Sequence, residues 1–352
     1  MPLPAVLFGG PSPEHDISIT TGLMAVRTLG RCHPIYWDKT GRFHLVEDSL
    51  EPADFADGVP RKVRELTFVA EPGSGFLSKK KPLDISVIVL ATHGGPGEDG
   101  TLQGMLDLAG YRYSGPGQAG SALGMDKLAF GGAVERLGLP TLPRVLLNSV
   151  PPPFDGPYIL KPRFGGSSIG IEVVDDHATA LALASASPHH LDGTVVEPFL
   201  DGVRDLQVAV RFYPSPQTSM IEEPAQGAGG VYSYTQKYLA WDESSGVSNP
   251  KAGLSVELDG EVRRMAEIVA RMIGIRGIAR VDFLASGDDV RVNEINTIPG
   301  SLSGSLWAPI SREELLRDVV TELEATSARR YSTHGADGMA LRNARSIASK
   351  LG

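Results

Sequence analysis

The sequence predicts an α/β amino-terminal region built on a parallel sheet, followed by an α+β region. The apolar runs Leu3–Phe8 and Ile85–Ala91 each end at a glycine-rich turn, and a helical rhythm of apolar residues follows each turn. Repeated strand–turn–helix units favour a parallel sheet. Beyond about residue 120, short apolar runs and helical stretches follow one another in mixed order, which favours α+β.

The two strand–turn–helix units are the clearest elements of the amino-terminal region. Gly9–Pro11 ends the first apolar run and Ile17–Leu29 follows as a helix, whereas His93–Gly97 ends the second run and Thr101–Ala109 follows. In parallel sheets ligands bind where the strands end, so both turns are candidate walls of a site. Turns that only connect elements are the alternative. We expect the boundary between the two regions near residues 115–120.

The second region is expected to consist mainly of short strands. They are predicted near Thr141–Leu147, Tyr158–Lys161, Ile169–Val174, Val195–Glu197, Leu206–Phe212, Gly277–Ala285 and Val290–Glu294. A helix is predicted from about Glu261 to Ile273, and a capping box of Ser311 and Glu314 predicts the start of another. After about Arg330 the pattern fades into a tail or a loosely held helix.

Composition excludes several classes of function. The 352 residues carry 33 Lys and Arg against 42 Asp and Glu, a net charge of −9, so bulk charge attracts neither nucleic acid nor an anionic membrane. Cys32 is the only cysteine, which excludes an intrachain disulfide and fits a reducing compartment. No apolar run approaches the roughly 18 residues of a membrane span, and Met1–Gly10 lacks a secretory signal. We expect a cytoplasmic protein.

Four polar residues are expected to meet on one face of a β-hairpin. Arg280 and Asp282 lie two apart in one predicted strand, Glu294 and Asn296 lie two apart in the next, and residues two apart share a face. A turn at Gly287 brings the two pairs side by side. Three oxygen ligands beside an arginine suit Mg²⁺, which leaves its other positions to water and phosphate. A solvated polar face with an Arg–Glu cross-strand pair is the alternative.

A second candidate feature is a strand that ends at Lys161 and runs into a loop of glycines and serines, Phe164–Gly170. The amides and hydroxyls of such a loop can surround phosphate oxygens. The loop is neither a P-loop, because the lysine precedes the glycines, nor a dinucleotide fingerprint. We interpret it as a cover that closes over a nucleotide, with a flexible Gly-Ser linker as the alternative.

Lysines supply a third indication of a nucleotide. Lys127, Lys161 and Lys237 stand in apolar or aromatic surroundings of an acidic chain. Each alone is typical of a solvated surface charge, but beside a Mg²⁺ site they provide the positive charge that a triphosphate requires. The strand end Val195–Leu200 offers backbone groups for an adenine edge, and Asp205 offers a carboxylate for ribose hydroxyls.

Together these residues resemble the D-alanine–D-alanine ligase family of ATP-grasp enzymes, over roughly Leu3 to Leu323. The similar segments follow the family's order: Phe8–Ser18, His93–Gly104, Ser121–Lys127, Lys161–Pro162, Gly166–Gly170, Tyr234–Tyr238, Arg280–Asp282 and Asn293–Gly300. The resemblance implies an ATP-grasp fold. Its parts would be an amino-terminal, Rossmann-like, substrate-binding domain over 1–117, a central ATP-grasp lobe over 118–200, a carboxyl-terminal lobe over 201–330 and a tail over 331–352.

The resemblance also implies roles for individual residues. Those implied to bind ATP are Lys127, Lys161, Ser168, Glu197, Phe199, Asp205, Lys237 and Asn293. Those implied to bind two Mg²⁺ ions, or Mn²⁺, are Asp282, Glu294 and Asn296. The implied catalytic residues are Glu14, Ser167, Tyr238, Arg280 and Gly300. The substrate cleft would be lined by Glu14, His93, Arg280, Gly300, Ser305 and Leu306.

Within the implied catalytic set, Arg280 and the Gly300 amide would form an oxyanion hole. Glu14, Ser167 and Tyr238 would form a hydrogen-bonded trio that orients the first amino acid and ties down a closing loop. Lys237 would reach the γ-phosphate from that loop.

The activity that the resemblance implies is the ATP-dependent joining of two D-alanine molecules through an acyl phosphate, for cell-wall precursors, by a cytoplasmic homodimer. Two departures affect this expectation: Asp205 stands where the family usually has Glu, and an extra residue near Trp307 changes the segment that meets the second substrate. A related ligase that uses D-serine or D-lactate, or that serves secondary metabolism, is therefore an alternative. By the same resemblance, Tyr238 favours an amine acceptor, because the depsipeptide-forming relatives usually have another residue there.

Two other classes of protein are less consistent with the residues. A regulatory nucleotide-binding protein on the same fold has little use for an arginine that faces the phosphates, as Arg280 does. A nicotinamide-dependent oxidoreductase is suggested only by the first strand–turn–helix unit, which lacks the spaced glycines that a pyrophosphate requires.

Overall fold

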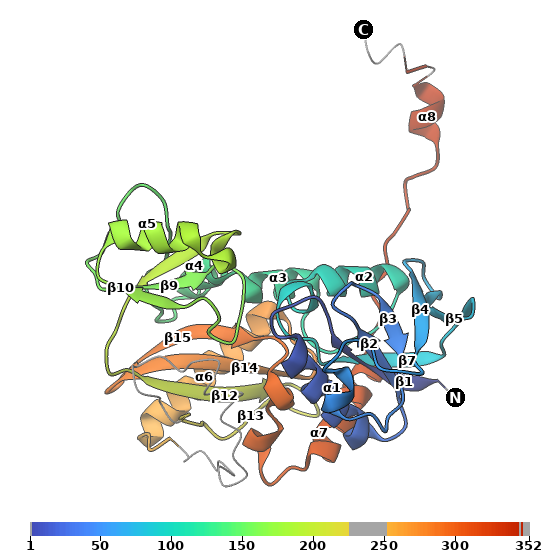
Figure 1. Cartoon of the computed structure of the whole chain (residues 1–352), viewed down its shortest axis with the longest axis horizontal. Helices are drawn as coiled ribbons and strands as arrows, with labels where there is room; N and C mark the ends of the chain where they lie inside the picture. The colour runs from blue at the N-terminus through green and yellow to red at the C-terminus, as the bar shows by residue number, and fades with distance from the viewer. Residues whose placement is uncertain (1, 225–251, 345, 348–352) are drawn as a thin grey trace.

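The computed structural model describes residues 2–224, 252–344 and 346–347. Within them, one seven-stranded sheet and two four-stranded sheets organise the chain. In Figure 1 the amino-terminal sheet, in blue, lies on the right, and the two smaller sheets lie one above the other on the left. The helices α2 (Thr101–Ala109) and α3 (Gln118–Met125) run along the top between the two halves (Figure 1).

The first sheet combines a parallel part with an antiparallel part. Its order is β6-β5-β4-β3-β2-β1-β7, with the strands β1 (Leu3–Gly9), β2 (His33–Trp37), β3 (Phe43–Leu45), β4 (Arg64–Val69), β5 (Gly75–Ser78), β6 (Lys81–Pro82) and β7 (Ile85–Leu90). β1 pairs in parallel with β2 and with β7, which confirms the predicted parallel sheet for these strands. The helix α1 (His15–Leu29) provides the crossover from β1 to β2.

The antiparallel extension of this sheet did not emerge from the sequence pattern. The pairs from β2 to β6 are all antiparallel. Several of their connections, such as the one between Trp37 and Phe43, are too short for the crossover that a parallel pair needs. The amino-terminal sheet is therefore mixed.

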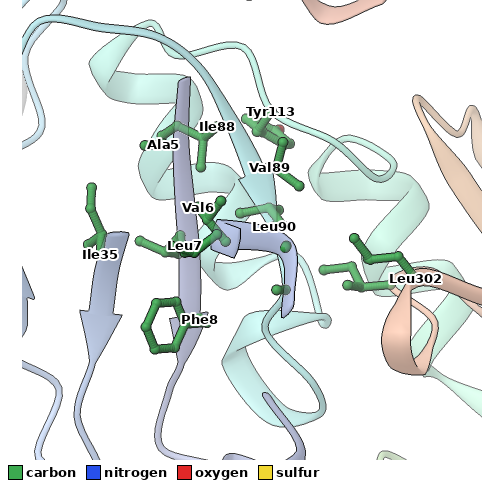
Figure 2. Close-up of a cluster of buried hydrophobic side chains, with 14 of the residues drawn as sticks. Ala5, Val6, Leu7, Phe8, Ile35, Ile88, Val89, Leu90, Tyr113 and Leu302 are labelled. Carbon is green, nitrogen blue, oxygen red and sulfur yellow. The ribbon is translucent and has the colours of Figure 1, made fainter. Parts of the chain in front are cut away.

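The core of the first sheet also receives the carboxyl-terminal part of the chain. Figure 2 shows Val6 and Leu7 of β1 between Ile35 of β2 and the strand β7, with Leu302 approaching from a distant segment. Leu302 belongs to the same buried cluster, as do the apolar residues of α7 (Arg312–Ala325). Burial of each such side chain contributes about 1.5–3 kcal/mol, so this contact fixes the segment around Leu302 on the amino-terminal sheet.

The central lobe is a small antiparallel sheet covered by one helix. Its order is β10-β9-β11-β8, with the strands β8 (Val145–Leu146), β9 (Tyr158–Pro162), β10 (Glu172–Val174) and β11 (Thr194–Pro198). The helix α5 (His177–Ala186) packs on β9 and β10 through Ala180, and the Asp176 side chain caps it by accepting from the Thr179 amide at 2.9 Å.

Two predicted strands of this lobe are shorter than expected. The strand predicted over Thr141–Leu147 is reduced to Val145–Leu146, because Pro143 lacks the N–H that a ladder requires. The strand predicted over Ile169–Val174 is reduced to Glu172–Val174, because Gly170 turns the chain at φ 74°.

The third sheet carries the hairpin singled out in the sequence. Its order is β13-β12-β14-β15, with the strands β12 (Arg204–Arg211), β13 (Gln217–Thr218), β14 (Ile278–Ser286) and β15 (Asp289–Asn296). The helix α6 (Val256–Ile273) shares its buried cluster, as do residues of α4 (Lys127–Arg136). The start predicted for α6 near Glu261 is wrong, because Ser255 caps the helix by accepting from the Leu258 amide at 3.2 Å.

The last described segments are two helices, α7 and α8 (Met339–Asn343). Ser311 caps α7, as predicted, by accepting from the Glu314 amide at 3.1 Å. Beyond it the short helix α8 extends away from the body of the molecule (Figure 1). Across the described residues, no helix combines the length and apolar character needed to cross a membrane.

Candidate active site

The hairpin β14–β15 brings the four predicted polar residues together. Its register places Arg280 opposite Asn296 and Asp282 opposite Glu294. The Nε and Nη2 atoms of Arg280 donate to the two Asp282 oxygens at 2.7 and 2.8 Å, and Asn296 Nδ2 donates to Asp282 at 3.0 Å. Asp282 is buried, so this group is a structured cluster rather than a solvated face.

A cleft between the two four-stranded sheets collects the residues predicted to bind ATP. Every described member of that set lines it: Lys127, Lys161, Ser168, Glu197, Phe199, Asp205 and Asn293. Asp282 and Glu294 line the same cleft. Its remaining wall is largely apolar and includes Ile159, Ile171 and Leu284. Lys237 and Tyr238 lie outside the described residues.

Lys161 is held at the cleft by a fully buried carboxylate. In the register of β9 and β11, Lys161 lies diagonally from Glu197 on one face of the sheet. Lys161 Nζ donates to Glu197 at 2.7 Å and to Asn293 Oδ1 at 3.1 Å. Burial by itself raises the pKa of Glu197, but the ammonium of Lys161 and the guanidinium of Arg144 outweigh it and hold that pKa below its usual value.

Arg144 is a residue of this site that the sequence analysis missed. Its Nε lies 2.8 Å from Glu197 Oε1 as an ion pair, and its side chain is 3% exposed. Arg144 Nη1 donates to the Lys127 carbonyl at 3.0 Å, and Nη2 donates to the Asn293 carbonyl. The available signal was an arginine inside an otherwise apolar run, Leu142–Leu147.

Lys127 stands at the start of α4, where a cap and an ion pair hold the chain. Asp126 caps the helix by accepting from the Leu128 and Ala129 amides, and Arg163 donates to it at 2.9 and 2.6 Å. Lys127 Nζ donates to the Gly165 carbonyl, at the entrance of the glycine–serine loop. Burial lowers the pKa of Lys127, and Glu294 offsets part of that effect.

Two members of the predicted trio meet between the loop and the first glycine turn. Ser167 Oγ donates to Glu14 Oε1. A Cβ at Gly94 would lie 2.3 Å from Glu14 Oε2, so the second glycine turn, His93–Gly97, approaches this carboxylate through a glycine. Ser167 and Ser168 have φ of 53° and 58°, a left-handed conformation that is costly for serine and that clusters at functional sites.

His93 and Thr21 connect the second turn to α1 and to the carboxyl-terminal loop. His93 Nε2 lies 2.9 Å from Thr21 Oγ1, and the Ser301 amide donates to Thr21 Oγ1 at 3.2 Å. Burial lowers the pKa of His93 to about 4, so its ring is neutral at neutral pH. Thr21 carries no sequence signal beyond its place in a helix, and the sequence analysis missed it.

Glu98 was noted only as part of a motif, and the structure gives it a defined position. Its carboxyl accepts from the Gly94 amide at 2.7 Å, from Thr297 Oγ1 at 3.1 Å and from the Ile298 amide at 3.0 Å. Burial raises its pKa, and the neighbouring Glu14 raises it further. Glu98 therefore joins the second turn to the segment that leads to Gly300.

The segment Gly300–Trp307 carries the remaining predicted residues. It contains Ser301, Leu302 and Ser303 in the left-handed region, at φ 48–51°. Ser305 is exposed, whereas the Leu306 side chain is buried and its carbonyl accepts from the Met220 amide at 3.1 Å. Any contact of Leu306 with a substrate is therefore through its backbone.

The donor set at the hairpin fits a hard divalent cation. It consists of two carboxylates and one amide, and Mg²⁺ prefers such oxygen ligands. Among the described residues, His, Cys, Asp and Glu side chains do not form a group of three or more that could hold a metal by themselves. Phosphate oxygens and water would have to complete the coordination.

Comparison with known proteins identifies the chain's relatives. The family described as D-ala D-ala ligase N-terminus matches residues 4–116, and the one described as D-ala D-ala ligase C-terminus matches residues 135–318. A D-alanine–D-alanine ligase of Chlorobaculum tepidum is 34% identical over 86% of this chain and 90% of the relative, and one of Campylobacter lari is 32% identical over 86% and 88%.

Solved structures agree with these relatives. The crystal structure of D-alanine–D-alanine ligase from Helicobacter pylori superposes with a TM-score of 0.75 at 27% identity, covering 92% of this chain and 99% of that chain. The VanG D-Ala:D-Ser ligase of Enterococcus faecalis has a TM-score of 0.74 at 22% identity, covering 91% and 98%, a likeness of fold. The predicted ATP-grasp fold is confirmed, and the chain belongs to the D-alanine–D-alanine ligase family.

Proposed function

We propose that this chain is an ATP-dependent carboxylate–amine ligase that joins two D-alanine molecules into D-alanyl-D-alanine, with ADP and phosphate as the other products, for peptidoglycan precursors. The observation that carries the proposal is the gathering of Lys127, Lys161, Asp282 and Glu294 in one cleft. Relatives named D-alanine–D-alanine ligase at 32–34% identity support the choice of substrate.

In this proposal the cleft holds ATP. Lys127 and Lys161 bind the phosphates, with Ser168 and Asn293 beside them. The apolar wall and the strand end at Glu197 and Phe199 receive the adenine, and Asp205 binds the ribose. Lys237, outside the described residues, is assigned to the γ-phosphate. Asp282, Glu294 and Asn296 would hold two Mg²⁺ ions, or Mn²⁺, which would neutralise charge on the transferred phosphoryl group.

A carboxylate is a poor acyl donor, so the ligation needs ATP to activate it first. The carboxylate oxygen of the first D-alanine attacks the γ-phosphorus and releases ADP, and the amine of the second then attacks the acyl carbon and releases phosphate. Arg280 and the Gly300 amide stabilise the tetrahedral oxyanion, at about 3–4 kcal/mol per donor. Glu14 orients the first amino acid, with Ser167 and Tyr238 closing over it to exclude water that would hydrolyse the acyl phosphate. His93, Ser305 and the Leu306 backbone line the substrate side.

The proposal includes the organisation of the chain. The ranges 1–117, 118–200 and 201–330 each contain one of the three sheets, which supports a substrate-binding domain followed by two ATP-grasp lobes, with a tail over 331–352. We also propose a cytoplasmic homodimer.

The substrate assignment is tested by turnover. Purified protein with ATP and Mg²⁺ should release phosphate in proportion to the D-alanine consumed, and mass spectrometry should detect D-alanyl-D-alanine. Parallel reactions offer D-serine or D-lactate together with D-alanine. If a mixed product forms faster than D-alanyl-D-alanine, the acceptor is D-serine or D-lactate instead of D-alanine. An absence of D-alanine-dependent turnover would reject the assignment.

The role of Arg280 is tested by substitution. Arg280→Ala should lower kcat by about 100- to 1000-fold, the loss expected for one oxyanion donor, while ATP binding stays measurable. Arg291→Ala is a matched control, because Arg291 forms a similar pair with Asp289, two residues away near the exposed turn of the same hairpin. It should retain activity within about twofold. Equal activity of both variants would contradict the assigned role.

A further inference from the structure

We propose that Arg144 is a positioning residue of the nucleotide site that keeps the positive charge of Lys161 available to a polyphosphate. The inference rests on the proposed function only in taking the cleft as the ATP site. It assigns a role to a residue that contacts the cleft residues from behind rather than lining the cleft.

The first argument is geometric. The guanidinium of Arg144 joins segments that are far apart in the sequence: it donates to the carbonyls of Lys127 and Asn293 and forms the ion pair with Glu197. Lys127 and Asn293 each place a side chain in the cleft, and Glu197 holds Lys161 there. One rigid planar group therefore sets the relative position of α4, β11 and β15.

The second argument is the sum of the buried charges. Lys161 and Glu197 lie 2.7 Å apart, with Glu197 fully buried, so by themselves they form a neutral pair. A neutral pair attracts a phosphate weakly. Arg144 shares the same carboxylate from its other oxygen, at 2.8 Å, so the three groups together carry one net positive charge. Because the site is shielded from solvent, that charge acts on a phosphate with little screening.

A structural role alone predicts a different response to substitution. If Arg144 only fills space and ties segments together, removing Glu197 as well should add damage. If its charge also matters, removing Glu197 as well should recover part of the lost ATP affinity, because Lys161 is again left with an uncancelled charge. A double-mutant cycle separates the two cases.

The test is direct ATP binding by isothermal titration calorimetry, with Mg²⁺ and without D-alanine. Arg144→Met should raise the ATP Kd at least tenfold. The double variant Arg144→Met/Glu197→Gln should bind ATP at least threefold more tightly than Arg144→Met, and Arg144→Lys, which keeps the charge but not the planar fork, should also bind ATP more tightly than Arg144→Met. Arg204→Met is the matched control: it breaks a similar ion pair, with Glu223, on the strand that carries Asp205, and should leave the Kd unchanged.

The outcomes are distinct. An unchanged Kd in Arg144→Met, or a double variant that binds ATP no better than that single variant, would overturn the inference. If Arg144→Met does not fold, the double variant and Arg144→Lys decide the question: both should bind ATP measurably, and loss of ATP binding in both would overturn the inference. Because binding is measured without D-alanine, a failure of the proposed ligase activity does not affect this result, and a chain that ligates D-alanine with unchanged Kd values would reject only the role of Arg144.

Discussion

Two regions of this molecule each bury a glutamate, and the pKa values of those carboxyl groups move in opposite directions. In the cleft between the two four-stranded sheets, Lys161 and Arg144 hold the pKa of Glu197 below its usual value despite complete burial. In the second glycine turn, burial and the neighbouring Glu14 raise the pKa of Glu98. The difference teaches that the charges of the neighbours, rather than burial itself, decide the ionisation of a buried carboxyl group.

The two regions are accordingly suited to different ligands. The cleft contains buried cations that are already in place, which suits the negative charge of a polyphosphate. The turn region contains a neutral histidine, His93, and a glutamate whose neutral form is favoured. Such surroundings can position a small polar molecule by hydrogen bonds. Because these two side chains are neutral, they do not compete with the charges of that molecule.

The largest effect on stability is expected from Lys161→Met. It leaves Glu197 with one cation, and breaking a buried ion pair costs about 3 kcal/mol or more of the free energy of unfolding. Lys127→Met is the control, because the hydrogen bond it loses is to the Gly165 carbonyl, with an expected cost of about 1 kcal/mol. Urea unfolding of both variants at pH 7 gives the comparison. Equal losses would mean that the Glu197 pair is no more costly to break than one hydrogen bond.

A second effect is expected from the pH dependence of His93. Because its pKa in the folded chain is lowered from 6.5 to about 4, it contributes stability above pH 6.5 that is lost as the pH falls toward 4. The contribution is about 3 kcal/mol over that interval. His93→Gln should remove it, so the difference in unfolding free energy between parent and variant should shrink from pH 7 to pH 4.5. A constant difference would show that the ring charges freely in the fold.

Effects of opposite sign at the two glutamates are expected from amide substitutions. Glu98 has a raised pKa, so its contribution is present below its ordinary value of 4.5 and is lost as the pH rises through the raised pKa. Glu197 has a lowered pKa, so its contribution is present above 4.5 and is lost as the pH falls through the lowered pKa. Glu98→Gln and Glu197→Gln should each flatten one side of the profile of unfolding free energy against pH, and for Glu98, whose pKa rises from 4.5 to about 8, the change should be roughly 3 kcal/mol or more.

Measurement of both profiles by thermal or urea unfolding between pH 2 and 9 tests the comparison directly. If both substitutions flatten the same side, the contrast between the two regions fails.

Much of the fold and of the cleft could be predicted because the signals are local. The polar cluster on β14–β15 depended on alternation along two strands and one turn, and the register confirmed it. The start of α7 depended on one cap, at Ser311. The predicted bounds of the strand at Val145–Leu146 and of α6 were wrong at their amino-terminal ends. There a single proline or serine outweighs the apolar pattern.

What the sequence by itself determined about this protein is the order of its elements and the chemistry each one carries, because strand alternation, caps and glycine turns act over a few residues. What only the tertiary structure decided is which distant groups meet: Arg144 with Glu197 and Asn293, Glu98 with the Thr297–Ile298 segment, and Leu302 with the amino-terminal core. Those contacts depend on how three sheets are placed against one another. That placement is set by the burial of whole faces, which no short pattern encodes.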